Sequence, residues 1–387
     1  MSLPELKADL FADQAIRDPH PLYRVIRARA PAVWLPEHAV FALGRYDDVR
    51  AALRSDKVLI SGGGVALNDA VNGLPSRTTL MSDGALHRQR RGVLMKPMMP
   101  RALSAVRPEL DALADALVVE LEERDTFDGI TDFAQVLPVS VVSRLVGLPE
   151  AGREQMLDWA TATFNALGPP NARAQASFSR LGEMARYASE VKSDLLALDG
   201  WAAGVFAAAR EGRLDPLDAQ GLLVDYIGPS LDTTILASGW LLYLLGTYPD
   251  QYDLVRANPD RIPAVVHEVL RFESPVRAFT RLARAPYEAG EVSIPAGERV
   301  LILYGAANRD ERHYPAPDCF DVTREAWDHL AFGQGTHRCA GAHLAQLELE
   351  ALLRALVARV RRIEVGEPEV LMSNMLRGLQ KLPARFH

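Results

Sequence analysis

The segment that most constrains this chain lies near its carboxyl end, where residues 332–341 read FGQGTHRCAG. Glycine tolerates positive φ angles and has no side chain, so such a loop lets a flat cofactor approach the backbone closely. From Leu349 onward, leucine and valine recur at the spacing i, i+3, i+4, i+7, which predicts a helix that begins just after Gly341. Cys339 therefore precedes a helix N-terminus, whose free N–H groups and dipole favour a thiolate, the form of cysteine that binds metal ions.

Six positions of this segment form a pattern that chance rarely produces. They are Phe332, Gly333, Gly335, His337, Cys339 and Gly341. The pattern resembles the cysteine loop of cytochromes P450, in which a thiolate binds the iron of haem b (iron protoporphyrin IX) and promotes O–O cleavage. The resemblance implies that Cys339 is the axial iron ligand, that His337 binds a haem propionate, and that the rest of the loop contacts the haem. Without this pattern, Cys339 would be interpreted as a small buried hydrophobic residue.

Two further segments resemble parts of the same family. His87 and Arg91, at i and i+4, resemble the residues that bind a haem propionate, and Arg281 in FTRLARAP resembles a second propionate-binding arginine. Glu268 and Arg271 match the Glu-x-x-Arg helix of the family. An isolated pair at this spacing usually decorates a solvated face, but a buried pair here would hold the cysteine loop in place, which is a structural role.

The segment DYIGPSLDTTILASGWLLYLL, residues 225–245, resembles the central helix that crosses the distal haem face. Asp232 and Thr233 fall on its acid–alcohol pair, which implies that they hold dioxygen and deliver protons to it. The alternative for a mid-helix threonine is a hydrogen bond to the carbonyl four residues earlier. Pro229 and Ser230 depart from the family pattern. Because proline has no N–H, we expect the helix to open there, with the Ser230 hydroxyl facing the pocket.

The chain is predicted to be mainly α-helical with a minor β-sheet component, and the resemblance implies the cytochrome P450 fold. Residues 101–271 carry helical spacing almost throughout, whereas residues 283–304 break into short strand-like pieces divided by turn residues. No linker composition interrupts the sequence, so we expect one haem-binding catalytic domain over residues 1–387.

Charge and composition exclude several classes of protein. The net charge is −7 and the basic residues are scattered, which argues against a nucleic-acid partner. The longest apolar run, residues 235–245, is far shorter than the ~20 residues that cross a bilayer, and no secretion signal or membrane anchor is visible. Two cysteines are too few for a disulfide framework, so a cytoplasmic location is expected. Cys319 is predicted to be structural.

The electron donor implied by the resemblance is a separate ferredoxin with its reductase. Arg88, Arg90, Lys96 and Arg338 are expected to form a basic patch that attracts an acidic ferredoxin. The resemblance further implies a monooxygenase, which inserts one atom of O2 into a small organic substrate by hydroxylation or O-demethylation. Two alternatives remain: a peroxide-driven peroxygenase, and a haem sensor without turnover.

The expected substrate is an aromatic carboxylic acid, because TFNALGPPNARAQ and IGPSLDTTI are similar to family members that oxidise benzoate-like acids. A carboxylate loses its hydration in an apolar pocket and needs a cation or several donors to receive it. Arg77, with Ser76, Thr78 and Thr79 beside it, is the predicted binding residue for this carboxylate, and the alternative is that Arg77 faces solvent on a mobile loop. The other residues predicted to line the substrate pocket are Asn165, Ser230, Val276 and Phe279.

Overall fold

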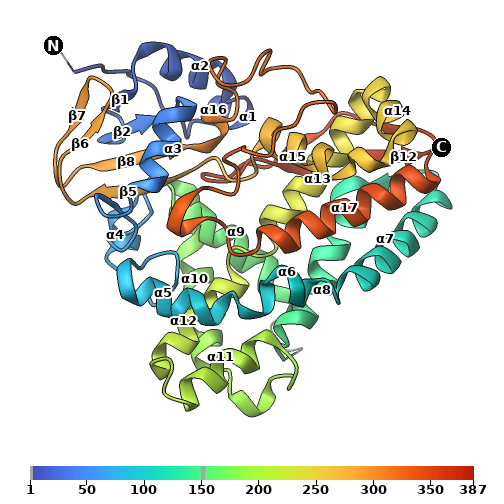
Figure 1. The fold of residues 1–387 in the computed structure, drawn as a ribbon, viewed down its shortest axis with the longest axis horizontal. Helices are drawn as coiled ribbons and strands as arrows, with labels where there is room; N and C mark the ends of the chain where they lie inside the picture. Colours follow the sequence, from blue (N-terminus) through green and yellow to red (C-terminus); the bar gives the residue numbers. More distant parts are fainter. Residues whose placement is uncertain (1–2, 150–152) are drawn as a thin grey trace.

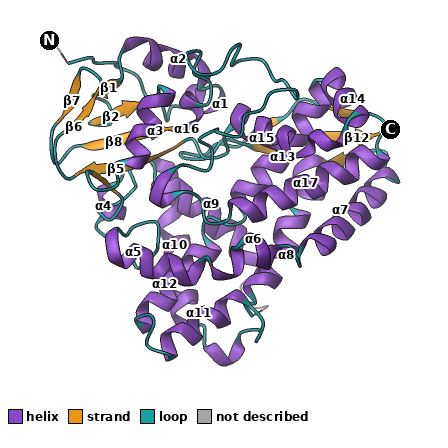
Figure 2. Ribbon diagram, viewed as in Figure 1, coloured by secondary structure: helices purple, strands orange, loops and turns teal. Residues whose placement is uncertain are grey.

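A computed structural model describes residues 3–149 and 153–387. Helices fill most of the molecule, while the largest group of strands gathers on the side of the N-terminus (Figures 1 and 2). This arrangement confirms the predicted class, mainly α with small sheets.

The longer helices cover both halves of the chain. Their bounds are α2 (His20–Arg29), α3 (Tyr46–Arg54), α5 (Gly84–Leu94), α7 (Arg107–Glu122), α8 (Val136–Val146), α9 (Met156–Ala166), α10 (Ala172–Glu190), α11 (Trp201–Arg210), α12 (Pro216–Ile227), α13 (Asp232–Thr247), α14 (Pro249–Ala257), α15 (Ile262–Glu273) and α17 (Ala342–Arg359). Shorter helices are α1 (Asp13–Arg17), α4 (Asp69–Asn72), α6 (Pro100–Leu103) and α16 (Tyr304–Ala307), and a π-helix, η2 (Gly129–Ala134), precedes α8. The predicted start of α17 directly after Gly341 is confirmed.

Within residues 3–149 and 153–387, short strands form four small sheets. Their bounds are β1 (Ala32–Leu35), β2 (Val40–Leu43), β3 (Leu59–Ile60), β4 (Phe127–Asp128), β5 (Ala278–Ala283), β6 (Tyr287–Ala289), β7 (Val292–Ile294), β8 (Arg299–Leu303), β9 (Ile363–Val365), β10 (Glu369–Val370), β11 (Leu379–Lys381) and β12 (Pro383–Phe386). The largest sheet has the order β1-β2-β8-β5-β3, and the other three are β4-β12-β9, β10-β11 and β6-β7.

The sequence analysis identified the strands around residues 283–304 but missed those near the N-terminus. β2 runs parallel to β8, with Phe41 opposite Val300 and Leu43 opposite Ile302. Every residue of β2 is buried, so this strand lacks the alternation of apolar and polar residues that marks a half-exposed strand. The pairing joins an N-terminal strand to β8, which in turn pairs with β5, the strand that carries residues of the site.

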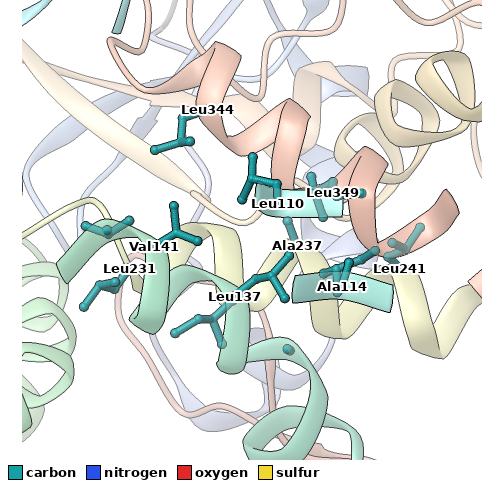
Figure 3. Close-up of a cluster of buried hydrophobic side chains, with 14 of the residues drawn as sticks. Leu110, Ala114, Leu137, Val141, Leu231, Ala237, Leu241, Leu344 and Leu349 are labelled. Carbon is teal, nitrogen blue, oxygen red and sulfur yellow. The ribbon is translucent and has the colours of Figure 1, made fainter. Parts of the chain in front are cut away.

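A hydrophobic core packs four helices together beneath the site. Figure 3 shows Leu110 and Ala114 of α7, Leu137 and Val141 of α8, Ala237 and Leu241 of α13, and Leu344 and Leu349 of α17. Figure 1 shows α17 lying alongside α7, as their contacts require. This packing sets α13 at a fixed distance from the start of α17, where the cysteine loop ends.

Residues 235–245 lie within α13 and are mostly buried, so the prediction of a core helix is confirmed. A different stretch, residues 129–146, is long and apolar enough to cross a membrane by length and composition alone. It spans η2 and α8 and is 61% buried inside the fold, as expected for a core segment.

Candidate active site

A largely apolar cavity lies between α13 and the cysteine loop. Its walls come from the loop before α5, from α5 itself, from α9, from the α12–α13 connection, from β5 and from the start of α17. Residues 331–333 and 337–341 line it on one side, and Pro229, Ser230, Thr233 and Thr234 line it on another. The fold thus brings together two segments that the sequence analysis had selected separately.

The cysteine loop needs glycine at two positions for reasons that the structure makes plain. Gly333 has φ +65° and Gly335 has φ +73°, the left-handed region that side chains disfavour. A Cβ atom on Gly335 would lie 2.6 Å from the carbonyl oxygen of Leu53. The Cys339 N–H donates to the carbonyl of Phe332 at 2.8 Å, which closes the loop.

The thiol of Cys339 lies deep in the protein, and its exposed surface faces the cavity. Burial raises the pKa of Cys339, while the N–H groups of Gly341 and Ala342 and the cations Arg91 and Arg338 lower it. A Cβ atom on Gly341 would meet nothing within 4 Å, so the space beside the thiol is open. A sulfur atom in this setting is a suitable ligand for iron at the centre of a flat macrocycle.

Cationic and imidazole groups gather around the same cavity. Arg91, Arg281, His337 and Arg338 line it, and His87 does not line it but packs against His337 with ring centroids 4.2 Å apart. Both ring nitrogens of His87 are buried without a hydrogen-bond partner among the described residues, and Nε2 of His337 has only a long contact of 3.5 Å with Asp83 Oδ1. Buried imidazoles rarely stay unsatisfied, so these groups fit the carboxylates of a haem, whose propionates would supply the missing acceptors.

Glu268 and Arg271 form a fully buried ion pair on α15. Two hydrogen bonds join them, from Nε to Oε2 at 2.6 Å and from Nη2 to Oε1 at 2.8 Å. Arg271 also donates to the carbonyls of Asn308 and Pro317, both at 2.9 Å, and to that of Cys319 at 3.3 Å. The pair therefore ties α15 to the long segment that leads into the cysteine loop.

The helix opens at Pro229, as the sequence predicted: α12 ends at Ile227, α13 begins at Asp232, and the residues between form turns. The Thr233 hydroxyl lines the cavity and donates to the Pro229 carbonyl at 3.1 Å. This bond is the alternative considered for a mid-helix threonine. The Ser230 hydroxyl donates to the Tyr226 carbonyl. The hydroxyls of Thr233 and Ser230 therefore both lie beside the break between α12 and α13.

Asp232 is buried beside Thr233 but is not part of the cavity lining. Its carboxyl group accepts a hydrogen bond from the Thr161 hydroxyl on α9 at 2.7 Å. Burial raises the pKa of Asp232 to about 7, against the lowering effect of this hydrogen bond. The acid therefore exchanges its proton near neutral pH.

Two acids of the cavity wall were missed by the sequence analysis. Asp225 of α12 lines the cavity, and burial raises its pKa to about 7. Glu348 of α17 also lines it; burial raises its pKa to about 8, and its Oε1 has no hydrogen-bond partner. Glu348 lies four residues after Leu344 and four residues before Leu352. This helical spacing predicts that it lies on the buried face of α17. No local signal distinguished Asp225.

The predicted substrate residues divide into two groups. Ser230, Val276 and Phe279 line the cavity, whereas Ser76, Arg77 and Asn165 do not. The Arg77 guanidinium binds Asp218 at 3.0 Å and Asp215 at 3.4 Å, both at the start of α12, and the hydroxyls of Ser76 and Thr78 lie 2.9 Å apart.

Asn165 holds the turn around Asn374, whose N–H donates to Asn165 Oδ1 at 2.9 Å. Each of these three side chains is thus engaged in a structural contact outside the cavity. They are corrected here from substrate contacts to structural residues.

The predicted basic patch also needs one correction. Arg88, Lys96 and Arg338 are exposed, but Arg90 is buried and binds Asp218 at 2.8 Å. Arg90 shares this carboxylate with Arg77, so it secures the loop before α5 to α12 and offers no charge to a partner protein.

Comparison with known proteins gives one consistent result. The family model described as Cytochrome P450 matches residues 197–384. Cytochrome p450 CYP199A2 of Rhodopseudomonas palustris is 35% identical over 390 residues, which cover 99% of this chain and 95% of that protein. The 6-deoxyerythronolide B hydroxylase of Saccharopolyspora erythraea is 33% identical, with 100% of this chain and 99% of that protein covered. The structure of Mycobacterium marinum cytochrome P450 CYP268A2 in complex with pseudoionone matches with a TM-score of 0.89 at 27% identity, covering 100% of both chains.

Proposed function

The chain belongs to the cytochrome P450 family of haem-dependent monooxygenases and has its fold, and from this premise we propose that it oxidises a small, largely apolar molecule with O2 and electrons from a ferredoxin. Members of the family bind haem b through a cysteine thiolate. The observation that carries the proposal is the cavity, which joins the thiol of Cys339 and the hydroxyl of Thr233 from segments far apart in the sequence. We further propose that the chain acts as one catalytic domain.

The residues of the cavity fit a haem. Cys339 would bind its iron, and Arg91, Arg281, His337 and the neighbouring His87 would hold its propionates. When bound, the haem supplies an iron centre that activates dioxygen for transfer of one oxygen atom. The Glu268–Arg271 pair would act as a positioning element, because it fixes the segment that ends in the cysteine loop.

On the other wall, Thr233 and Asp232 would manage protons. The Thr233 hydroxyl now donates to the Pro229 carbonyl, and by rotating towards the cavity it would donate to an oxygen atom there. Asp232 exchanges its proton near neutral pH. Its partner Thr161 is half-buried on α9, so protons would reach Asp232 from the side that faces away from the cavity.

This pair of residues favours O2 over the two alternatives. Hydrogen peroxide already carries the protons that Asp232 and Thr233 would supply, so a peroxygenase would not need them. A haem sensor without turnover would need neither a proton-exchanging acid nor an opened helix. Both alternatives lead to different results in the same assay.

The assay uses the purified holoprotein with ferredoxin, its reductase, NADPH and alkyl- or methoxybenzenes as probes. We expect a product that requires both O2 and NADPH and that contains one atom from isotopically labelled O2. Equal product formation with hydrogen peroxide alone would assign the chain as a peroxygenase. A thiolate-type carbon monoxide spectrum without product in any condition would assign it as a sensor.

A ferredoxin donor is supported by exposed basic residues on and beside α5. We expect the double substitution Arg88→Glu and Lys96→Glu to raise the apparent KM for ferredoxin on the order of tenfold at low salt, because steering by charge accelerates encounter. High salt should remove the difference. The control Lys381→Glu, an exposed lysine on β11, should leave this KM unchanged, and an equal effect of the control would contradict the proposed docking face.

A cytoplasmic location belongs to this proposal, since Cys319 and Cys339 are both free thiols, as a reducing compartment maintains them. Aromatic side chains in the cavity wall, Phe164, Phe279 and Trp201 among them, support an aromatic substrate. Arg77, which was expected to bind the carboxylate of the substrate, forms ion pairs with Asp218 and Asp215 instead. The expected carboxylate therefore has no assigned binding residue. The proposal therefore keeps the aromatic ring and not the acid group.

A further inference from the structure

Asp225 is the acid that the α12 side of the cavity wall presents to the substrate space. It stands one turn before Pro229, in the part of the wall that also includes Thr79, Tyr226 and Ser230. The residue is half-exposed although it lies deep in the protein, so its accessible surface faces the cavity. Building on the proposed function, we propose that Asp225 anchors the substrate and that the substrate carries a cationic nitrogen, as in a basic amine or a quaternary ammonium group.

Among the described residues, Asp225 has no cation at ion-pair distance, although hydrogen-bond donors and more distant arginines act on its carboxyl group. Its Oδ2 accepts a hydrogen bond from the Thr79 N–H at 2.6 Å, and the Thr79 hydroxyl and the Leu80 N–H are further donors that lower its pKa. Arg90 and Arg91 both act electrostatically on this carboxyl group, but Arg90 is bound by Asp218 at 2.8 Å. Burial raises the pKa of Asp225 to about 7 despite the lowering by Thr79 and Arg90. A cation in the cavity would therefore favour the ionised form and be held by it.

The remaining cations of the cavity do not take this role. Arg91, Arg281 and Arg338 lie on its lining, and the first two are the proposed propionate partners. Arg91 also donates to the Arg338 carbonyl, which directs it to the cysteine loop. Once a haem is bound, its two propionates offset the charge of Arg91 and Arg281. We therefore expect Asp225 to favour binding of a cationic substrate over an anionic one.

Aromatic rings supply a second, independent feature for a cationic ligand. Trp201 and Tyr226 both line the cavity, with ring centroids 5.8 Å apart, and Phe164 and Phe279 line it with centroids 6.3 Å apart. The face of an aromatic ring attracts a cation, and rings around a carboxylate are the usual setting for quaternary ammonium groups. A substrate carboxylate would meet Asp225 as a like charge and would lose its hydration without gaining a partner.

The test compares three ligands that share one phenylpropyl group in the holoprotein. They are phenylpropyl trimethylammonium, the neutral hydrocarbon in which carbon replaces its nitrogen, and phenylbutanoate. A quaternary nitrogen has no lone pair, so it cannot bind the iron and confuse the spectrum. Binding is followed at pH 8, where Asp225 is ionised, by the shift of the Soret band and by isothermal titration calorimetry. We expect the ammonium ligand to bind at least tenfold more tightly than the hydrocarbon, and phenylbutanoate to bind most weakly.

The matched variant is Asp225→Asn, which keeps the shape and the acceptor for the Thr79 N–H. We expect it to lose the preference for the ammonium ligand while its affinity for the hydrocarbon changes less than threefold. Asp225→Ser also keeps an acceptor and serves if the asparagine variant does not fold. The reduced carbon monoxide spectrum of each variant reports whether the haem pocket is intact.

The outcomes separate this inference from the function on which it rests. If wild type shows no thiolate-type carbon monoxide spectrum, the proposed function fails. If that spectrum is present and the hydrocarbon binds, but the ammonium ligand binds no more tightly, only the role of Asp225 fails. Preference for phenylbutanoate, or a preference for ammonium that survives in both variants, overturns the inference as well.

Discussion

The two walls of the cavity differ in how their charged groups are satisfied. On the cysteine side, the buried carboxylate of Glu268 meets Arg271 in two hydrogen bonds and also accepts from the Asp321 N–H at 3.1 Å. On the helix side, Asp232 is buried and Asp225 is half-exposed to the cavity. Neither has a cation at ion-pair distance in the described part of the chain, and their pKa values rise to about 7. The carboxylate that braces the cysteine loop is therefore compensated, whereas Asp225 and Asp232 gain and lose protons, as does Glu348, the uncompensated acid of α17.

This difference follows from what each wall is proposed to do. An iron ligand must keep one position, and a fully paired ion network around it resists both motion and changes of pH. Proton delivery needs groups whose pKa lies near the working pH, and burial without a counter-ion produces such groups. The break at Pro229 adds to this, because it frees hydroxyls and carbonyls that a continuous helix would use internally.

The largest effect is expected on the cysteine side. Cys339→Ala should abolish the thiolate-type carbon monoxide spectrum completely, because no other thiol lines the cavity in the described residues, and the thioether of Met98 cannot form a thiolate. The protein should still fold, since the loop closes through backbone bonds such as that from the Cys339 N–H to Phe332. A thiolate spectrum in this variant would contradict the assignment, and circular dichroism checks the fold.

Next in size is the loss of the buried ion pair. Arg271→Ala leaves Glu268 buried without its partner, which should cost about 3–5 kcal/mol of unfolding free energy. Urea denaturation of the holoprotein measures this loss, and haem content should fall with it. The control Arg359→Ala breaks an exposed pair with Asp115 and should cost far less. Equal losses in both variants would show that Glu268 and Arg271 do not hold the loop.

A smaller effect, on chemistry alone, is expected on the helix side. Thr233→Ala should bind haem and probe substrates as wild type does, while product per NADPH falls severalfold and hydrogen peroxide rises, because the hydroxyl organises proton delivery. Thr233→Ser keeps the hydroxyl and is the matched control. Unchanged product per NADPH in the alanine variant would remove Thr233 from the mechanism.

The same contrast explains how far the sequence could predict the structure. The cysteine loop was predictable because its demands are local: Gly333 and Gly335 adopt positive φ within the loop, and the helix starts directly after it. The helix break was predictable from Pro229 for the same reason. Arg77 was misplaced because its partner Asp218 lies 141 residues away, and no local pattern reports which of several acids a long side chain will reach.

Asp225 was overlooked for a related reason. An acid near the end of a helix is usually solvated, and only the packing of α12 against the loop before α5 turns it into part of a cavity wall. The N-terminal strands were missed because β2 is buried on both faces. Structure that depends on the residues of one segment was therefore predictable from the sequence, whereas contacts between distant segments were not.

A last expected effect concerns the pH dependence of stability on the helix side. Burial raises the pKa of Asp232 from 3.8 to about 7 in the folded protein, so the folded state holds this proton where the unfolded chain releases it. The stabilisation is complete below about pH 4 and is lost as the pH rises to about 7, at up to about 1.4 kcal/mol per pH unit.

Asp232→Asn removes this dependence, while Asp225 and Glu348 contribute equally to both proteins. In urea denaturation, the stability of wild type minus that of Asp232→Asn should therefore fall between pH 5 and about 7 and then level off. Thr161→Val removes the hydrogen bond that lowers this pKa, so in that background the decline should extend to higher pH. A difference that does not vary with pH would mean that Asp232 is not a buried proton-exchanging acid, and the helix side would then resemble the cysteine side.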